Sequence, residues 1–162
     1  MKEKVAVYPG SFDPITFGHL DILSRGLELF DKVIVAIANN IEKKALFTVE
    51  ERKDLIRQSV NGNENVIIDS FDGLLVHYVK HVGARFVIRG LRAMSDFEFE
   101  FQMASMNRSL NPQMDTLFMM TGKDYFFVSS RTIKEVAQFG GSVDEFVPKV
   151  VALRLKEKVP KR

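Results

Sequence analysis

The sequence predicts an α/β protein built around one parallel β-sheet. Short runs of apolar and β-branched residues alternate with segments in which apolar residues recur three and four positions apart. The runs cover residues 5–8, 33–38, 66–68, 86–88 and 116–120. Such alternation is typical of a doubly wound, Rossmann-like sheet flanked by helices, so we expect five strands in the order 3-2-1-4-5.

Two helices are expected between the first three runs. Leucines at three- and four-residue spacing predict a helix over residues 18–30. The next helix begins after Thr48, because the Thr48 hydroxyl and the Glu51 carboxylate have the spacing of a capping box. Asn61 and Gly62 supply its end.

Two more helices are expected in the middle of the chain. An apolar stripe that begins at Leu75 predicts a third helix, which Gly83 closes. Residues 96–110 predict a fourth, which ends before Pro112. After the fifth run, residues 125–128 have the composition of a further short strand.

The rest of the chain predicts C-terminal helices. Ser129 or Ser130 can cap a helix that reaches Phe139, and a last helix is expected to begin near Pro148. No repeat or linker divides the sequence, so we expect a single domain over residues 1–162.

Composition narrows the classes of function. The 162 residues are 46% apolar and 27% charged, with a net charge of +2, so a basic coat for nucleic acid is not indicated. The absence of cysteine excludes disulfides and thiolate chemistry and favours a cytoplasmic location. The longest apolar run, residues 33–38, is far shorter than the roughly 20 residues that cross a bilayer, so no membrane association is expected.

The loop after the first run has the character of an anion site. Its backbone donors and the positive end of the following helix face one place, and Gly10 and Gly18 allow a ligand close to the main chain. Thr16 and His19 lie three positions apart across the helix start and can face the same point. His19 is therefore the first candidate for catalysis, and the alternative is a histidine that caps or packs locally.

A second set of candidates follows the fourth run. Arg89 and Arg92 lie just beyond a strand end, where guanidinium groups suit contacts with phosphate oxygens. In the expected strand order, strands one and four are neighbours, so this loop and the His19 loop open into one crevice. The alternative for the two arginines is an exposed face of ion pairs.

Two further segments carry weaker signals. Lys43 and Lys44 follow the second run and could close over the crevice, although charged runs are usually solvated. Ser129, Ser130 and Arg131 open a helix and offer hydroxyl and backbone donors, although helix capping explains the serines equally well.

His77 and His81 lie one helical turn apart, but no third ligand is spaced to complete a metal site. We therefore expect no metal held by protein ligands.

The fourth helix is apolar around much of its circumference, which predicts a buried helix or a subunit interface. The residues concerned are Phe97, Phe99, Phe101, Met103 and Met106. On the same helix, Glu100 lies one turn after Asp96, within reach of the arginine loop. Glu100 is therefore a candidate for a polar ligand contact, or an ordinary surface carboxylate.

With these residues in view, the chain resembles the bacterial phosphopantetheine adenylyltransferases, nucleotidyltransferases that share a HxGH or TxGH signature. Residues 16–19 form the TxGH version, Thr-Phe-Gly-His. The resemblance runs through the segments YPGSFDPITFGH, FTVEER, IRGLRAMSDFEFE and SSRTIKEV, in that order.

The resemblance implies reversible transfer of the adenylyl group of ATP to 4′-phosphopantetheine, giving dephospho-coenzyme A and pyrophosphate. It implies a phosphopantetheine site of Ser11, Lys43, Leu75 and Arg89. It implies an ATP site of Ser11, Phe12, His19, Gly90, Leu91, Arg92, Glu100, Tyr125, Phe126, Phe127, Val128, Ser129, Ser130 and Arg131. The catalytic group would be His19, Lys43 and Arg92.

The resemblance also implies magnesium held mainly by the ATP phosphates, coenzyme A as a possible feedback ligand, and a homohexamer. Arg131 departs from the family, which often has serine or threonine there, so its guanidinium either replaces a hydroxyl contact or points away. Two rivals stay open: another small nucleotidyltransferase with a different phosphorylated acceptor, and a non-catalytic nucleotide-binding module.

Overall fold

Five parallel strands form one sheet in the order β3-β2-β1-β4-β5, which confirms the predicted topology. The computed structural model describes residues 3–39 and 44–159, leaving aside the side chain of Ser95. The strands are β1 (Val5–Gly10), β2 (Lys32–Ala38), β3 (Val66–Phe71), β4 (Phe86–Leu91) and β5 (Asp115–Met120). Each strand is joined to the next by a helix, as parallel pairing requires.

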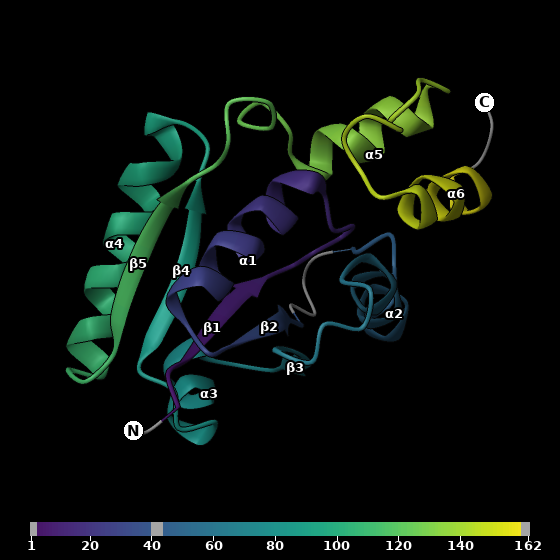
Figure 1. Ribbon diagram of the computed structural model, residues 1–162. Helices are drawn as coiled ribbons and strands as arrows, with labels where there is room; N and C mark the ends of the chain where they lie inside the picture. Colours follow the sequence, from purple (N-terminus) through teal and green to yellow (C-terminus); the bar gives the residue numbers. More distant parts are fainter. Residues whose placement is uncertain (1–2, 40–43, 160–162) are drawn as a thin grey trace.

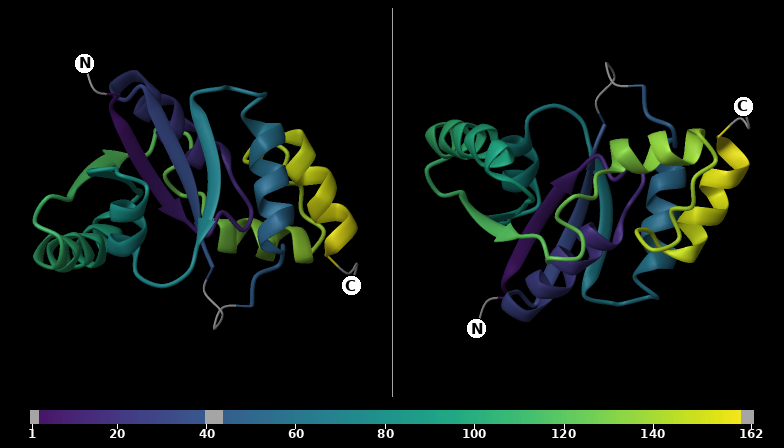
Figure 2. Two further views of the ribbon diagram at one scale, coloured as in Figure 1. Left: turned by 90° about the horizontal axis from the view of Figure 1, so that it is seen from below. Right: turned by 90° about the horizontal axis from the view of Figure 1, so that it is seen from above.

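Helices cover both faces of the sheet because the central strands are apolar on both sides. In β2, Val33 and Val35 face the core shared with α1, α2, α5 and α6, while Ile34 and Ala36 face the core shared with α3. Figures 1 and 2 show α4 beside β5 on one side of the molecule and α2, α5 and α6 together on the other. The helices are α1 (Phe17–Leu29), α2 (Val49–Ser59), α3 (Leu75–His81), α4 (Met94–Leu110), α5 (Ser130–Gln138) and α6 (Lys149–Lys158).

The two strands at the switch point of the sheet separate towards their carboxyl ends. β1 pairs with β4 only through Ala6 with Phe86 and Val7 with Val87. Its pairing with β2, in contrast, continues as far as Gly10. The space between the ends of β1 and β4 is therefore a position for a ligand site, as expected for a doubly wound sheet.

The helix starts follow the predicted caps. Thr48 accepts a hydrogen bond from the backbone N–H of Glu51, whose carboxylate accepts one from the Thr48 N–H, which confirms the capping box. Ser129 is the N-cap of α5. Residues 125–128, whose composition is strand-like, fold as turns, because the backbone N–H groups of Tyr125 and Val128 donate to carbonyls three residues earlier.

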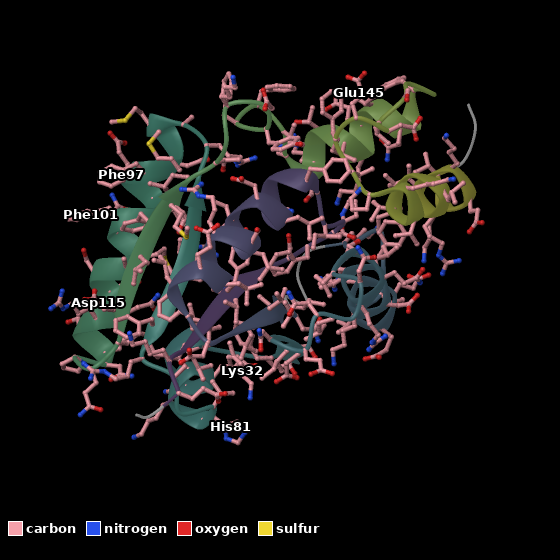
Figure 3. The ribbon with its side chains drawn as sticks, in the orientation of Figure 1. Lys32, His81, Phe97, Phe101, Asp115 and Glu145 are labelled. Carbon is pink, nitrogen blue, oxygen red and sulfur yellow. The ribbon has the colours of Figure 1, made fainter. Side chains whose placement is uncertain are left out.

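Helix α4 is not buried within this chain. We expected either a buried helix or a subunit interface, and the first of these is wrong. Phe97 packs against Phe101 and Phe118, yet Phe101 is 55% exposed. Figure 3 shows Phe97 and Phe101 along α4 at the edge of the molecule. Although α4 is 17 residues long, no helix in the described part of the chain combines the length and apolarity needed to cross a membrane.

Candidate active site at the carboxyl ends of β1 and β4

A cavity of about 600 Å³ lies where β1 and β4 separate, and we call it the site cavity. Its walls come from the loop after β1, the start of α1, the end of β4, α4, and the segment that leads into α5. The site cavity brings together most of the predicted site residues: Ser11, Phe12, His19, Arg89, Gly90, Arg92, Glu100, Val128, Ser129, Ser130 and Arg131. The His19 loop and the arginine loop thus open into one crevice, as the strand order predicted.

Other predicted site residues do not line this cavity. Leu75 begins α3 and packs against the core on the other face of the sheet. Leu91 ends β4, where it pairs with Met120, and Tyr125 packs against the ring of Phe17. Phe126 and Phe127 are both largely exposed. Lys43 lies outside the described residues.

The ring of His19 is fixed by the cap of its own helix. The backbone N–H of Thr16 donates to Nδ1 of His19 at 3.0 Å, and the His19 N–H lies 3.4 Å from Oγ1 of Thr16. Because Nδ1 accepts a hydrogen bond, a neutral ring carries its proton on Nε2. The capping role and the ligand-facing role of His19 are therefore compatible, since they use different nitrogens.

The surroundings of His19 keep the imidazole neutral. Burial lowers the pKa of His19 to about 4, and the positive charges of Arg92 and Arg89 act in the same direction. At neutral pH, His19 is therefore a hydrogen-bond donor through Nε2, without a positive charge.

The backbone of Phe12 turns the loop after β1. Phe12 has a φ of +45° and is buried, with its ring in edge contact with Tyr8 and His19. A Cβ atom on Gly10 would lie 3.0 Å from the Phe12 ring, a tight contact, so glycine gives this ring room where it folds back. The ring of Phe12 is part of the core. The predicted contact between Phe12 and a ligand would therefore be made by its backbone.

Asp13 connects the loop after β1 to two other segments of the chain. Its buried carboxylate accepts hydrogen bonds from the backbone N–H groups of Leu46 and Phe47, both at 2.9 Å. It also pairs with Nζ of Lys134 in α5 at 2.6 Å. A carboxylate with three donors holds the loop after β1, the segment before α2 and α5 in one arrangement.

Two more hydrogen bonds hold the same loop. Arg52, buried in α2, donates to the carbonyl oxygen of Ser11 at 2.8 Å, and Oγ of Ser130 donates to the carbonyl oxygen of Pro14 at 2.7 Å. Ser129 accepts from the N–H of Thr132 at 3.0 Å. Both serine hydroxyls therefore have structural partners, and the first backbone N–H groups of α5 are the donors this segment offers to an anion.

The two predicted arginines are held by two carboxylates of α4. Arg89 binds both oxygens of Glu100, and its Nη1 donates to the carbonyl oxygen of Pro9 at 2.8 Å. Arg92 pairs with Asp96 at 3.1 Å. Glu100 is thus not an ordinary surface carboxylate, because its side chain is 13% exposed and fully engaged with Arg89.

Sequence analysis missed several residues of this site. Tyr8, Ile22, Phe99 and Thr121 line the site cavity. Burial raises the pKa of the Tyr8 hydroxyl, which therefore stays protonated. No pattern in the sequence pointed to Thr121. Tyr8 did have a signal, because side chains alternate along β1 and Tyr8 lies on the same face of the strand as Ala6.

These features define a class of protein: α/β enzymes that handle nucleotides in a crevice shared by the first helix and the loop after the fourth strand. A histidine that donates a hydrogen bond, two arginines and the first turns of two helices can bind and orient several phosphate groups. Such a site suits transfer of a nucleotidyl group, which is the chemistry of the nucleotidyltransferases.

Comparison with known proteins identifies the family. Residues 7–136 match the model of the cytidylyltransferase-like family. The chain is 56% identical over 156 residues to the phosphopantetheine adenylyltransferase of Anaeromyxobacter sp. (strain K), covering 96% of this chain and 95% of the relative. It is 56% identical over 160 residues to the protein of that name from Syntrophotalea carbinolica, covering 99% and 96%. The chain belongs to the phosphopantetheine adenylyltransferase family of cytidylyltransferase-like proteins.

Proposed function

We propose that this protein transfers the adenylyl group of ATP to 4′-phosphopantetheine, giving dephospho-coenzyme A and pyrophosphate in coenzyme A biosynthesis. The observation that carries the proposal is the TxGH histidine, which its helix cap orients in a cavity that also contains Arg89 and Arg92. Identity above 50% with relatives of that name, over nearly the whole of both chains, supports the same acceptor.

The reaction needs position and charge more than it needs a base. The attacking group of the acceptor is a phosphate oxygen that is already an anion, so no residue has to remove a proton and no covalent intermediate is required. The oxygen attacks the α-phosphorus of ATP, the bond to the β-phosphate oxygen breaks, and pyrophosphate leaves in line.

His19 supplies a donor where negative charge grows. Its Nε2–H donates to an oxygen of the α-phosphate, and this bond strengthens as charge develops in the transition state. The hydrogen bond from Thr16 to Nδ1 keeps the ring in the orientation and tautomer for this task. The proton stays on His19 throughout.

The arginines divide between the two substrates. Arg92 and the first N–H groups of α5, with the guanidinium of Arg131 beside them, hold the phosphates of ATP. Arg89 holds the phosphate of phosphopantetheine. Lys43, which the resemblance assigns to catalysis and to the acceptor, would add charge from the segment after β2.

Magnesium enters with ATP in this proposal. The two carboxylates that line the site cavity, Asp96 and Glu100, both bind arginines, so the donor set suits an ion coordinated mainly by phosphate oxygens and water. Bound in this way, the ion would neutralise charge on the triphosphate.

We also infer a homohexamer, with coenzyme A as a feedback ligand of the same cavity. The exposed apolar side chains of α4, including Phe101 and Met106, support a contact between subunits. Light scattering of the purified protein measures the mass directly, and a monomer at micromolar concentration would contradict the assembly. A cytoplasmic location stays a prediction that cell fractionation can test.

A panel of acceptors tests the proposed function. Pyrophosphate release from ATP and magnesium is measured with 4′-phosphopantetheine, with unphosphorylated pantetheine, and with other phosphorylated acceptors such as mononucleotides. We expect release with 4′-phosphopantetheine only. Release with a different acceptor alone would favour another nucleotidyltransferase, and ATP binding without release would favour a binding module.

A further inference from the structure

We infer that Glu100 is a positioning residue for the acceptor: it fixes the guanidinium of Arg89 so that two N–H groups face the place of the acceptor phosphate. The inference rests on the proposed function and deepens it. The family resemblance places Glu100 with ATP, whereas the geometry points to an action on the acceptor through Arg89.

The hydrogen bonds of Arg89 leave a defined pair of donors. Nε and Nη2 donate to the two oxygens of Glu100 at 2.7 and 2.5 Å, and Nη1 donates to the carbonyl oxygen of Pro9 at 2.8 Å. A guanidinium has five N–H groups. Two therefore remain, one on Nη1 and one on Nη2, and Arg89 lines the site cavity.

The two partners of Arg89 lie on two elements other than its own strand, β4. Pro9 belongs to β1, beyond the point where pairing with β4 stops, and Glu100 belongs to α4. The guanidinium bridges these two elements, and its three hydrogen bonds hold it in one orientation. An arginine that is already held in one orientation loses little conformational freedom when the ligand arrives. This lowers the entropic cost of binding.

Depth also separates the roles of the two side chains. The side chain of Arg89 is 31% exposed and that of Glu100 is 13% exposed, so the carboxylate is the more enclosed member of the pair. A carboxylate is also a poor direct partner for a phosphate group, because both are negative. The competing role for Glu100 is a hydrogen bond from a hydroxyl group of ATP to one of its oxygens.

The chain provides matched controls on the same helix. Glu98 is an exposed carboxylate that does not line the site cavity, so Glu98→Gln makes the same chemical change outside the site. Asp96 holds Arg92 one turn before Glu100, so Asp96→Asn disturbs the arginine that we assign to ATP.

The test measures kcat and the KM values for ATP and for the acceptor phosphopantetheine in Glu100→Gln, Arg89→Ala and the double variant. Glutamine has the same shape but replaces one acceptor oxygen with an NH₂ group that faces the arginine. We expect Glu100→Gln to raise the KM for phosphopantetheine roughly tenfold, with kcat and the KM for ATP within about twofold. Asp96→Asn should raise the KM for ATP instead, and Glu98→Gln should change neither.

The double variant isolates the route of the effect. If Glu100 acts through Arg89, then Glu100→Gln has no further effect on the KM for phosphopantetheine once Arg89 is alanine. A persisting effect of Glu100→Gln in the Arg89→Ala background would overturn the inference. A rise in the KM for ATP alone would also overturn it. So would a fall in kcat together with a rise in both KM values and a lower melting temperature. The wild type reports separately on the proposed function, which fails if phosphopantetheine does not support turnover.

Discussion

The backbone N–H of Thr16 and the imidazole of His19 form a 3.0 Å hydrogen bond that joins the cap of α1 to the histidine proposed for catalysis. In a usual capping box, a glutamate or glutamine side chain reaches back to the N-cap backbone. Here Nδ1 of His19 takes that role at the start of α1. The bond sets the tautomer of a neutral His19 ring and leaves Nε2–H as the donor that we propose for the substrate.

Replacement of His19 by alanine removes this donor and should affect the transition state more than ATP binding. We expect kcat and kcat/KM to fall together by about 10²–10³-fold, the loss typical of one such donor. Steady-state kinetics and ATP binding by calorimetry measure the two effects. A higher KM with unchanged kcat would remove His19 from the transition state.

The protonation state of His19 can be observed directly. The pKa of about 4 predicts a neutral ring with its proton on Nε2 at pH 7 and a titration midpoint near pH 4. Nitrogen NMR of the imidazole distinguishes the tautomers, and His77→Gln and His81→Gln variants assign the other two histidine signals. A charged His19 at pH 7 would contradict the proposed donor.

The same pKa predicts a pH dependence of stability. The folded pKa of about 4 lies below the ordinary value of 6.5, so between these values the unfolded chain binds more protons than the folded chain. The contribution of His19 to the free energy of unfolding is therefore complete above pH 6.5 and declines as the pH falls towards 4. Urea unfolding across this range should show a steeper decline for the wild type than for His19→Gln, and parallel curves would argue against the low pKa.

Replacement of Arg89 by alanine should weaken binding of the acceptor. We expect the KM for phosphopantetheine to rise about 10–100-fold, because a charged donor pair to phosphate is lost, while the KM for ATP changes little. Varying each substrate at saturation of the other measures this. An unchanged KM for phosphopantetheine would end the assignment of Arg89.

The Asp13 carboxylate should matter for the stability of the fold. Asp13→Asn keeps the shape but leaves Lys134 without its buried partner and turns one oxygen into a donor that faces a donor. We expect a loss of about 2–4 kcal/mol in the free energy of unfolding. Denaturant unfolding measures the loss. The variant Lys134→Met tests the pair from the other side, and a loss below about 0.5 kcal/mol in both variants would show that the pair is dispensable.

Local patterns predicted the parts of the site that are close in sequence. Thr16 and His19 are three residues apart, and helical spacing alone places them together. The strand order then brought Arg89 to the same crevice, because β1 and β4 are neighbours. Such inferences need only periodicity and topology.

Contacts between distant segments could not be predicted in the same way. The bond from Arg52 to the Ser11 carbonyl joins residues 41 positions apart, and it depends on how α2 packs. The turns over residues 125–128 have a strand-like composition, because aromatic residues suit both structures. The pairing of Glu100 with Arg89 depends on the angle of α4 to β4, which no sequence pattern fixes.

The most direct test of the proposed reaction follows the α-phosphate of ATP. The wild type is incubated with magnesium, 4′-phosphopantetheine and ATP that carries a radioactive α-phosphate, and the products are separated and identified by mass spectrometry. Adenylyl transfer predicts that the label appears in dephospho-coenzyme A, with unlabelled pyrophosphate formed in equal amount. Label in ADP or AMP, with no labelled dephospho-coenzyme A, would contradict the proposed function.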